Sequence, residues 1–98
     1  MYIVRDIFHL KFGHYREVKP LLDEAMASQF MPQVPGSRVL TDFTGKAYRL
    51  ILEQTTPSLA EYEKGLQQEL AHPDWKGWYD KFIQHVESSE REILKQIY

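Results

Sequence analysis

The sequence predicts an α+β domain with the element order β-α-β-β-α-(α)-β, a ferredoxin-like antiparallel sheet with helices on one face. Three observations predict it: apolar side chains alternate along residues 2–12, a hairpin pattern occupies residues 38–55, and helical stripes follow both regions. Ninety-eight residues accommodate one domain, so we assign residues 1–98 to it.

The first strand is predicted over residues 2–12. Its even positions are apolar except for Asp6, and its odd positions mix apolar side chains with Arg5 and His9. Because both faces carry apolar residues, we expect neither face to be simply open to water. Gly13 breaks the strand.

A helix is expected next, because apolar residues recur at three- and four-residue steps. They are Tyr15, Val18, Leu21, Leu22, Ala25, Met26 and Phe30. Pro20 allows two interpretations: the helix kinks there, or its regular part begins near Lys19 with Pro20 in the first turn. Pro32, Pro35 and Gly36 end the element and form a loop.

The middle of the chain predicts a hairpin, with strands over residues 38–43 and 47–55 and a turn at residues 44–46. The run 48–52 is apolar on both faces, as expected for a strand covered on both sides. Ser58 and Glu61 then form a capping box for a helix that ends at residues 72–73.

A third helix is expected after Asp74, which can cap it, and Ser88 and Ser89 break it. Residues 90–98 read as the last strand, with Ile93 and Ile97 alternating against Leu94 and Tyr98. A C-terminal helix is the alternative there, because Glu, Arg, Lys, Gln and Leu all favour helix.

Helices on one face of this sheet leave the other face bare, with large apolar side chains on it. A chain of this size cannot cover that face itself. A C₂ dimer that presses two sheets together would bury it and close a barrel. We therefore expect a homodimer formed through the sheet face.

Composition excludes several functional classes. With 12 basic and 14 acidic side chains and a net charge of −2, no nucleic-acid footprint is present. The chain has no cysteine, which excludes disulfides and thiol chemistry. No apolar run reaches the length of a membrane span, so the expectation is a soluble, cytoplasmic protein without a membrane partner. In the absence of HExxH, P-loop and GxGxxG motifs, we expect neither a metal nor a cofactor.

Four stretches carry a resemblance to a known superfamily: the first strand running into residues 11–13, the hairpin, the aromatic segment 75–79 with Phe82, and the segment 89–94. With them the chain resembles the dimeric α/β-barrel superfamily, and within it NIPSNAP-like and antibiotic-biosynthesis-monooxygenase-like domains. The resemblance implies an eight-stranded barrel made from two sheets. The superfamily includes cofactor-free oxygenases, haem-degrading enzymes and aldehyde-processing enzymes, so it does not select an activity. Haem-degrading members use an Asn that this sequence lacks.

Two clusters are candidates for chemistry. Polar strand residues are expected to face the barrel interior: Arg5, His9, Arg49, Glu53 and Arg91. In a functional interpretation the arginines bind an anionic group and His9 is the general base. In the alternative interpretation, the same residues form an internal ion-pair network that fixes the register of the dimer.

The second cluster is the aromatic stripe Trp75, Trp78, Tyr79 and Phe82, with His85 close behind. Helical spacing favours core packing, and the alternative is that Trp75 and Trp78 stack on a planar ligand near the barrel mouth. His14 and His72 lie at ordinary positions near helix ends.

The leading functional hypothesis is a homodimer that binds or oxidises a small hydrophobic or aromatic molecule in the barrel interior, with cofactor-independent monooxygenase-like chemistry. The alternative is a non-catalytic dimerisation module whose barrel is filled by its own side chains. The sequence leaves open whether the domain is an enzyme.

Overall fold

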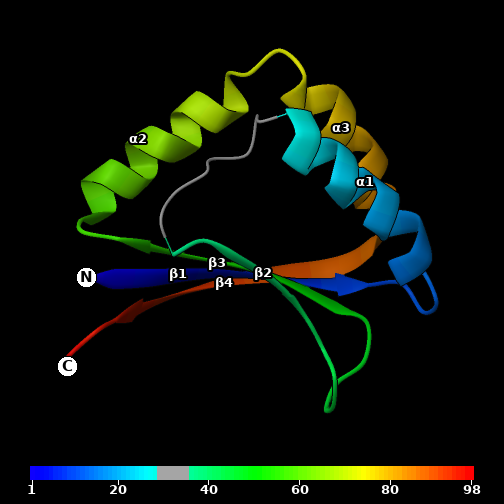
Figure 1. Cartoon of the computed structure of the whole chain (residues 1–98), viewed down its shortest axis with the longest axis horizontal. Helices are drawn as coiled ribbons and strands as arrows, with labels where there is room; N and C mark the ends of the chain where they lie inside the picture. The colour runs from blue at the N-terminus through cyan, green and yellow to red at the C-terminus, as the bar shows by residue number, and fades with distance from the viewer. Residues whose placement is uncertain (29–35) are drawn as a thin grey trace.

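The computed structural model describes residues 1–28 and 36–98, and it shows one layer of strands with the helices on a single face (Figure 1). In chain order the elements are β1 (Tyr2–Leu10), α1 (Tyr15–Ser28), β2 (Arg38–Thr41), β3 (Arg49–Thr56), α2 (Leu59–Leu70), α3 (Trp75–Phe82), the 3₁₀ helix η1 (Ile83–His85) and β4 (Val86–Lys95). This order confirms the predicted ferredoxin-like α+β class.

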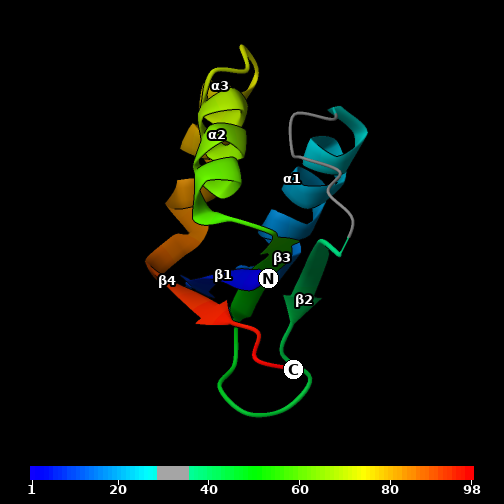
Figure 2. The same cartoon turned by 90° about the vertical axis from the view of Figure 1, so that its left-hand side faces the viewer.

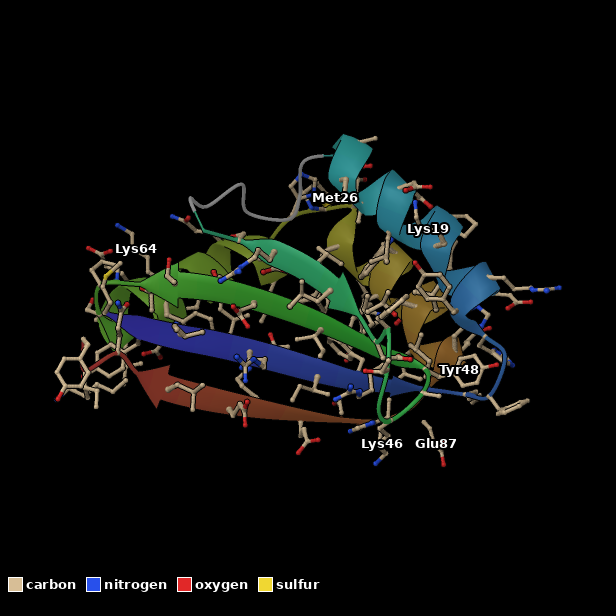
Figure 3. All side chains as sticks on the ribbon, turned by 60° about the horizontal axis from the view of Figure 1, so that its bottom comes forward. Lys19, Met26, Lys46, Tyr48, Lys64 and Glu87 are labelled. Carbon is tan, nitrogen blue, oxygen red and sulfur yellow. The ribbon has the colours of Figure 1, made fainter. Side chains whose placement is uncertain are left out.

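The sheet has the strand order β2-β3-β1-β4, and each neighbouring pair is antiparallel. Figure 3, which brings the uncovered face forward, shows the four strands side by side. In the end-on view of Figure 2, α2 and α3 lie on the β4 side and α1 lies on the β2 side. Because directly opposed residues share a face, the register determines which side chains meet on each side of the sheet.

The hydrophobic core lies between the helices and the even-numbered face of β1. Phe82 is central to it: its ring meets Phe8 edge-on, with centroids 5.0 Å apart, and stacks on Trp78 at 5.1 Å. The Trp78 indole Nε1 donates to the Leu21 carbonyl at 2.6 Å and so ties α3 to α1. The other buried hydrophobic residues that the structure describes are Val4, Leu10, Val18, Leu22, Ala25 and Leu50.

The predicted alternation along the first strand is confirmed, but the strand is shorter than predicted. Val4 and Leu10 are buried beneath the helices, as their even positions require. β1 ends at Leu10, and Phe12 lies beyond it in the turn, exposed to solvent with its ring against Tyr48.

Pro20 lies inside α1, so the interpretation in which the regular helix begins near Lys19 is wrong. The helix has already started: the Val18 amide donates to the His14 carbonyl at 3.1 Å. Pro20 lacks the N–H that would continue the ladder, a cost that the buried face of α1 offsets. The predicted positions Phe30, Pro32 and Pro35 lie outside the described residues.

The hairpin connection is longer than the predicted turn at residues 44–46: β2 ends at Thr41 and β3 begins at Arg49. Tyr48, labelled in Figure 3, has φ of 60°, a left-handed conformation that no strand tolerates. Side-chain hydrogen bonds close the loop instead, because Asp42 Oδ1 accepts from the Arg49 amide at 2.7 Å and Thr41 Oγ1 donates to the Arg49 carbonyl at 2.9 Å.

At the helix starts, one predicted cap forms and one does not. Ser58 Oγ accepts from the Glu61 amide at 3.1 Å, which confirms the cap of α2. The prediction for Asp74 is wrong, since its side chain makes no capping bond. Its backbone is already helical, and its amide donates to His72 Nδ1 at 3.1 Å instead.

The C-terminal segment is a strand, so the helical alternative is wrong, and the strand begins earlier than residue 90. β4 pairs with β1 from Val86 to Lys95, and Ser88 and Ser89 lie inside it rather than at a break. The preceding helix, α3, ends instead at Phe82, where η1 begins. Pairing along the length of β1 overrides the helix propensity of this segment.

Candidate functional site

α2 and α3 form an arch over the sheet (Figure 1). A cavity of about 400 Å³ is lined by residues of both helices and of the sheet. Its apolar lining is Phe8, Leu52, Leu66, Leu70, Trp75, Trp78, Tyr79 and Phe82. Leu70 is 50% exposed, so the cavity reaches the surface beside the end of α2. This volume and this mostly apolar wall are typical of small-molecule sites.

The wall contributed by α3 is aromatic. Trp75 and Tyr79, four residues apart on one helix face, stack with ring centroids 4.4 Å apart and planes 15° from parallel. The Trp75 indole Nε1 donates to Glu69 Oε1 at 3.3 Å, which links α3 to α2. Both predicted tryptophans therefore line the cavity, and Trp78 is also part of the core.

The polar end of the cavity is formed by side chains from three elements: Asp6 of β1, Tyr62 and Glu69 of α2, and Arg91 of β4. Arg91 Nε donates to Asp6 Oδ1, and its guanidinium lies 5.6 Å from the centroid of the Tyr62 ring. The Tyr62 hydroxyl is buried and has no hydrogen-bond partner among the described residues. Buried hydroxyls in folded proteins usually have a partner, and a water or a ligand group at this end of the cavity would supply one.

Burial shapes the ionisation of this end. It raises the pKa of the Glu69 carboxyl. The hydrogen bond from Trp75 lowers this pKa by less than burial raises it, and the nearby Asp6 charge raises it further. Burial also raises the pKa of the Tyr62 phenol. The bond to Asp6 raises the pKa of Arg91, and the two side chains form an ion pair with no net charge. Glu69 forms no ion pair within the part of the chain that the structure describes.

We expect Glu69→Gln to raise the thermal unfolding midpoint at pH 7. A carboxyl whose pKa is higher in the folded than in the unfolded chain binds more protons in the native state. Its contribution to stability therefore falls as the pH rises from the ordinary carboxyl pKa through the raised one, and this loss persists at pH 7. Glutamine removes the loss and still accepts from Trp75.

The measurement is thermal unfolding of wild type and variant at about pH 4 and pH 7, where the difference should be small at the lower pH and large at the higher one. Glu63→Gln, on the exposed side of α2, is the matched control and should change the midpoint little at either pH. A lower midpoint for Glu69→Gln at pH 7 would contradict the burial argument.

The uncovered face carries a different polar feature, a row of four charges that crosses all four strands. In strand order the row is Arg38, Glu53, Arg5 and Glu92. Glu53 accepts from Arg38 Nη2 at 3.0 Å and from Arg5 Nε at 3.0 Å, and Arg5 Nη1 reaches Glu92 at 2.7 Å. The signs alternate, so the row is neutral, and Glu53 is only 8% exposed between its two arginines.

The polar cluster expected from the sequence is therefore only partly assembled. Arg5 and Glu53 meet, and His9 lies on the same face with Nε2 at 2.9 Å from Glu90. Arg49 turns toward the β2–β3 loop, where its Nε donates to the Lys46 carbonyl at 3.0 Å.

Arg91 does not belong to this cluster, and its predicted placement is wrong. It pairs in register with Asp6, an even-numbered position of β1, so it lies on the helix-covered face.

The remaining histidines do not line the cavity. His14 Nδ1 and His85 Nδ1 lie 2.9 Å apart, and His72 Nδ1 accepts from Asp74. Within residues 1–28 and 36–98, no three metal-ligating side chains gather. No helix in the same ranges is long and apolar enough to cross a membrane.

Three residues of the polar end were missed by sequence reasoning, although each left a signal. Asp6 interrupts the apolar face of β1, and a charge at such a position needs a partner. Tyr62 belongs to the apolar stripe of α2, and Glu69 lies seven residues later on the same side of the helix. A carboxylate on the half-buried apolar stripe of α2 was therefore the signal for the site.

Several solved structures share this fold. A NIPSNAP family protein of unknown function from Agrobacterium tumefaciens has a TM-score of 0.86 at 15% identity, over 98% of this chain and 87% of that chain. An uncharacterised NIPSNAP domain protein from Burkholderia xenovorans has a TM-score of 0.83 at 13% identity, over 98% and 94%. A putative antibiotic biosynthesis monooxygenase from Nitrosomonas europaea has a TM-score of 0.69 at 16% identity, over 100% of both chains.

No family model matches the sequence, and no curated protein matches it. The structural likeness confirms, at the level of fold, the resemblance to NIPSNAP-like and antibiotic-biosynthesis-monooxygenase-like domains. A shared fold does not assign an activity, which depends on the residues of the site.

Proposed function

We propose that this domain binds a small planar aromatic molecule in the cavity between α2, α3 and the sheet. The observation that carries the proposal is the buried Tyr62 hydroxyl, which has no partner among the described residues and lies at the polar end of an aromatic-walled cavity of about 400 Å³. The proposed site thus lies on the helix-covered face of the sheet, rather than in the barrel interior expected from the sequence.

The two ends of the cavity suit different parts of such a ligand. The stacked pair Trp75 and Tyr79 offers flat apolar surface to an aromatic ring, which favours planar over aliphatic ligands. The Tyr62 hydroxyl can donate one hydrogen bond and accept others, and this gives orientation to a polar substituent. A neighbouring cavity of about 160 Å³ shares Tyr62 and Glu69, so it extends the site along α2.

We expect 2-naphthol to shift the indole N–H signals of Trp75 and Trp78 in a saturable NMR titration. These are the only two tryptophans in the chain, and both line the cavity. Ser89→Leu should abolish the shifts, because Ser89 lines the cavity beside Phe8 and a larger side chain there occupies the space.

Ser28→Leu is the control, since it makes the same chemical change at an exposed position near the end of α1. It should bind as the wild type does. If no planar two- or three-ring compound shifts either indole signal, or if Ser89→Leu binds as tightly as Ser28→Leu, the proposed site is wrong.

A second candidate function, oxidation of the bound molecule, is favoured by the fold shared with the putative monooxygenase from Nitrosomonas europaea. A phenol and dioxygen would give a quinone and water: one oxygen atom enters the ring, the other leaves as water, and the phenol supplies all four electrons. Glu69 is the candidate base in the cavity, because His9 lies on the opposite face. Oxygen consumption with phenolic ligands that is absent in Ser89→Leu would support this reaction. If no phenol that binds the wild type causes oxygen consumption, the reaction is excluded.

We also propose that a second copy of the chain covers the bare sheet face. Apolar side chains flank the charged row there, among them Leu40 and Leu94, which are 39% and 41% exposed in the single chain. A row that neutralises its own charges costs less to bury than isolated ions. Light scattering at micromolar concentration should give about twice the 11.6 kDa chain mass.

The titration and the light-scattering measurement together distinguish the ligand-binding domain from the alternative, a non-catalytic dimerisation module. A dimer that binds no planar compound would favour the module. A clean monomer would exclude both the module and the dimer, and would leave the cavity to be judged by the titration alone.

A further inference from the structure

We propose that the ligand of the cavity is a cationic arylalkylamine, an aromatic ring with an ammonium group on an alkyl side chain, and that the ammonium lies beside Glu69; this inference rests on the function proposed above. The side-chain charges at the polar end are Asp6, Glu69 and Arg91. Asp6 and Arg91 neutralise each other, and the Glu90 carboxylate is turned to His9 on the opposite face. One negative charge, that of Glu69, is left in excess.

Glu69 has unused capacity for a cation. Among the described residues, its carboxylate makes one hydrogen bond, the rather long one from the Trp75 indole at 3.3 Å, whereas a carboxylate can accept about four. Burial penalises its charged form while the cavity is empty, as the raised pKa of Glu69 shows. An ammonium that donates to Glu69 would relieve this penalty, and the gain would appear as affinity.

The aromatic wall favours a positive charge as well. Trp75 is bonded to Glu69 and stacked on Tyr79, so a group that reaches Glu69 also meets the faces or edges of these rings. The Tyr62 ring already has the Arg91 guanidinium 5.6 Å from its centroid, a cation–π contact within this cavity. Aromatic faces attract cations and give no such gain to anions.

A carboxylate ligand would find the opposite conditions. It would approach Glu69 and Asp6, and the nearby cation, Arg91, is already bonded to Asp6. Binding an anion would require Arg91 to leave Asp6 and expose that carboxylate, which is costly in a partly buried site. The charge arrangement therefore selects ammonium over alcohol, and alcohol over carboxylate.

Three ligands with one naphthalene skeleton test this order: 2-naphthylmethylamine, 2-naphthalenemethanol and 2-naphthoic acid. Dissociation constants are measured at pH 7 from the indole N–H signals of Trp75 and Trp78. We expect the ammonium to bind about tenfold more tightly than the alcohol, and the carboxylate about tenfold more weakly. Glu69→Gln should abolish the preference for the ammonium and retain alcohol binding, whereas Glu63→Gln should behave as wild type.

Each other outcome has a separate meaning. If the alcohol binds and the ammonium binds no more tightly, the amine inference is wrong while the aromatic site stands. If the carboxylate binds most tightly, Arg91 is the anchor and the inference is likewise wrong. If the preference survives in Glu69→Gln, Glu69 does not carry it. If none of the three ligands binds, the proposed function itself fails.

Discussion

Phe82→Ala should lower the free energy of unfolding by about 3–5 kcal/mol, the range for removal of a buried aromatic side chain. Phe82 is 2% exposed, and its ring contacts Phe8 from the sheet and both Trp78 and Tyr79 from its own helix. It therefore joins the α3 layer to the sheet layer. Small domains have only about 5–15 kcal/mol of stability, so this one change removes a large share of it.

Denaturant unfolding followed by circular dichroism measures this loss. Ile83→Ala is the neighbouring control, because Ile83 is 42% exposed and its truncation should cost about 1 kcal/mol or less. Phe82→Leu keeps part of the buried volume and should fall between the two, which provides a result if Phe82→Ala does not fold. Equal losses for Phe82→Ala and Ile83→Ala would show that Phe82 does not join the layers.

The order of elements was predictable because each strand and helix carries its own periodicity. The alternation along β1 assigned Val4 and Leu10 to the core correctly. The loop before β3 was not predictable, because nothing in the composition of residues 44–48 indicates that Tyr48 takes a left-handed conformation. Ser88 and Ser89 read as a break, yet both pair with β1, since long-range pairing outweighs local propensity.

The candidate site was only half predictable, for a related reason. Trp75 and Trp78 belong to one helix, so their common face follows from spacing alone. The pair Asp6 and Arg91 is separated by 85 positions and depends on the register of β4 against β1. A register shifted by one residue would place Arg91 on the opposite face, as the sequence interpretation did.

Neighbouring residues of β1 thus serve different surfaces. Asp6 faces the cavity, and Ile7 faces the bare side, where it lies between Ile51 of β3 and Glu90 of β4. The two proposals can therefore be tested separately, because a side chain can be changed on one face without entering the other. A ligand effect and an assembly effect need not appear in the same variant.

Ile7→Lys should convert the proposed dimer into a monomer, so that light scattering gives the 11.6 kDa mass of one chain. In the single chain the new ammonium lies opposite Glu90, which can pair with it, so the domain should stay folded. Between two sheets, the same group would lose its water in an apolar interface at a cost of several kcal/mol.

We expect the dissociation constant of the dimer to rise by at least about a hundredfold, equivalent to about 2.7 kcal/mol. Ile83→Lys makes the same change on η1, away from the sheet face, and should remain dimeric. The indole signals of Trp75 and Trp78 should still respond to 2-naphthol in Ile7→Lys, because the cavity lies within one chain. A dimer that persists in Ile7→Lys would show that the second copy binds elsewhere than on the bare face.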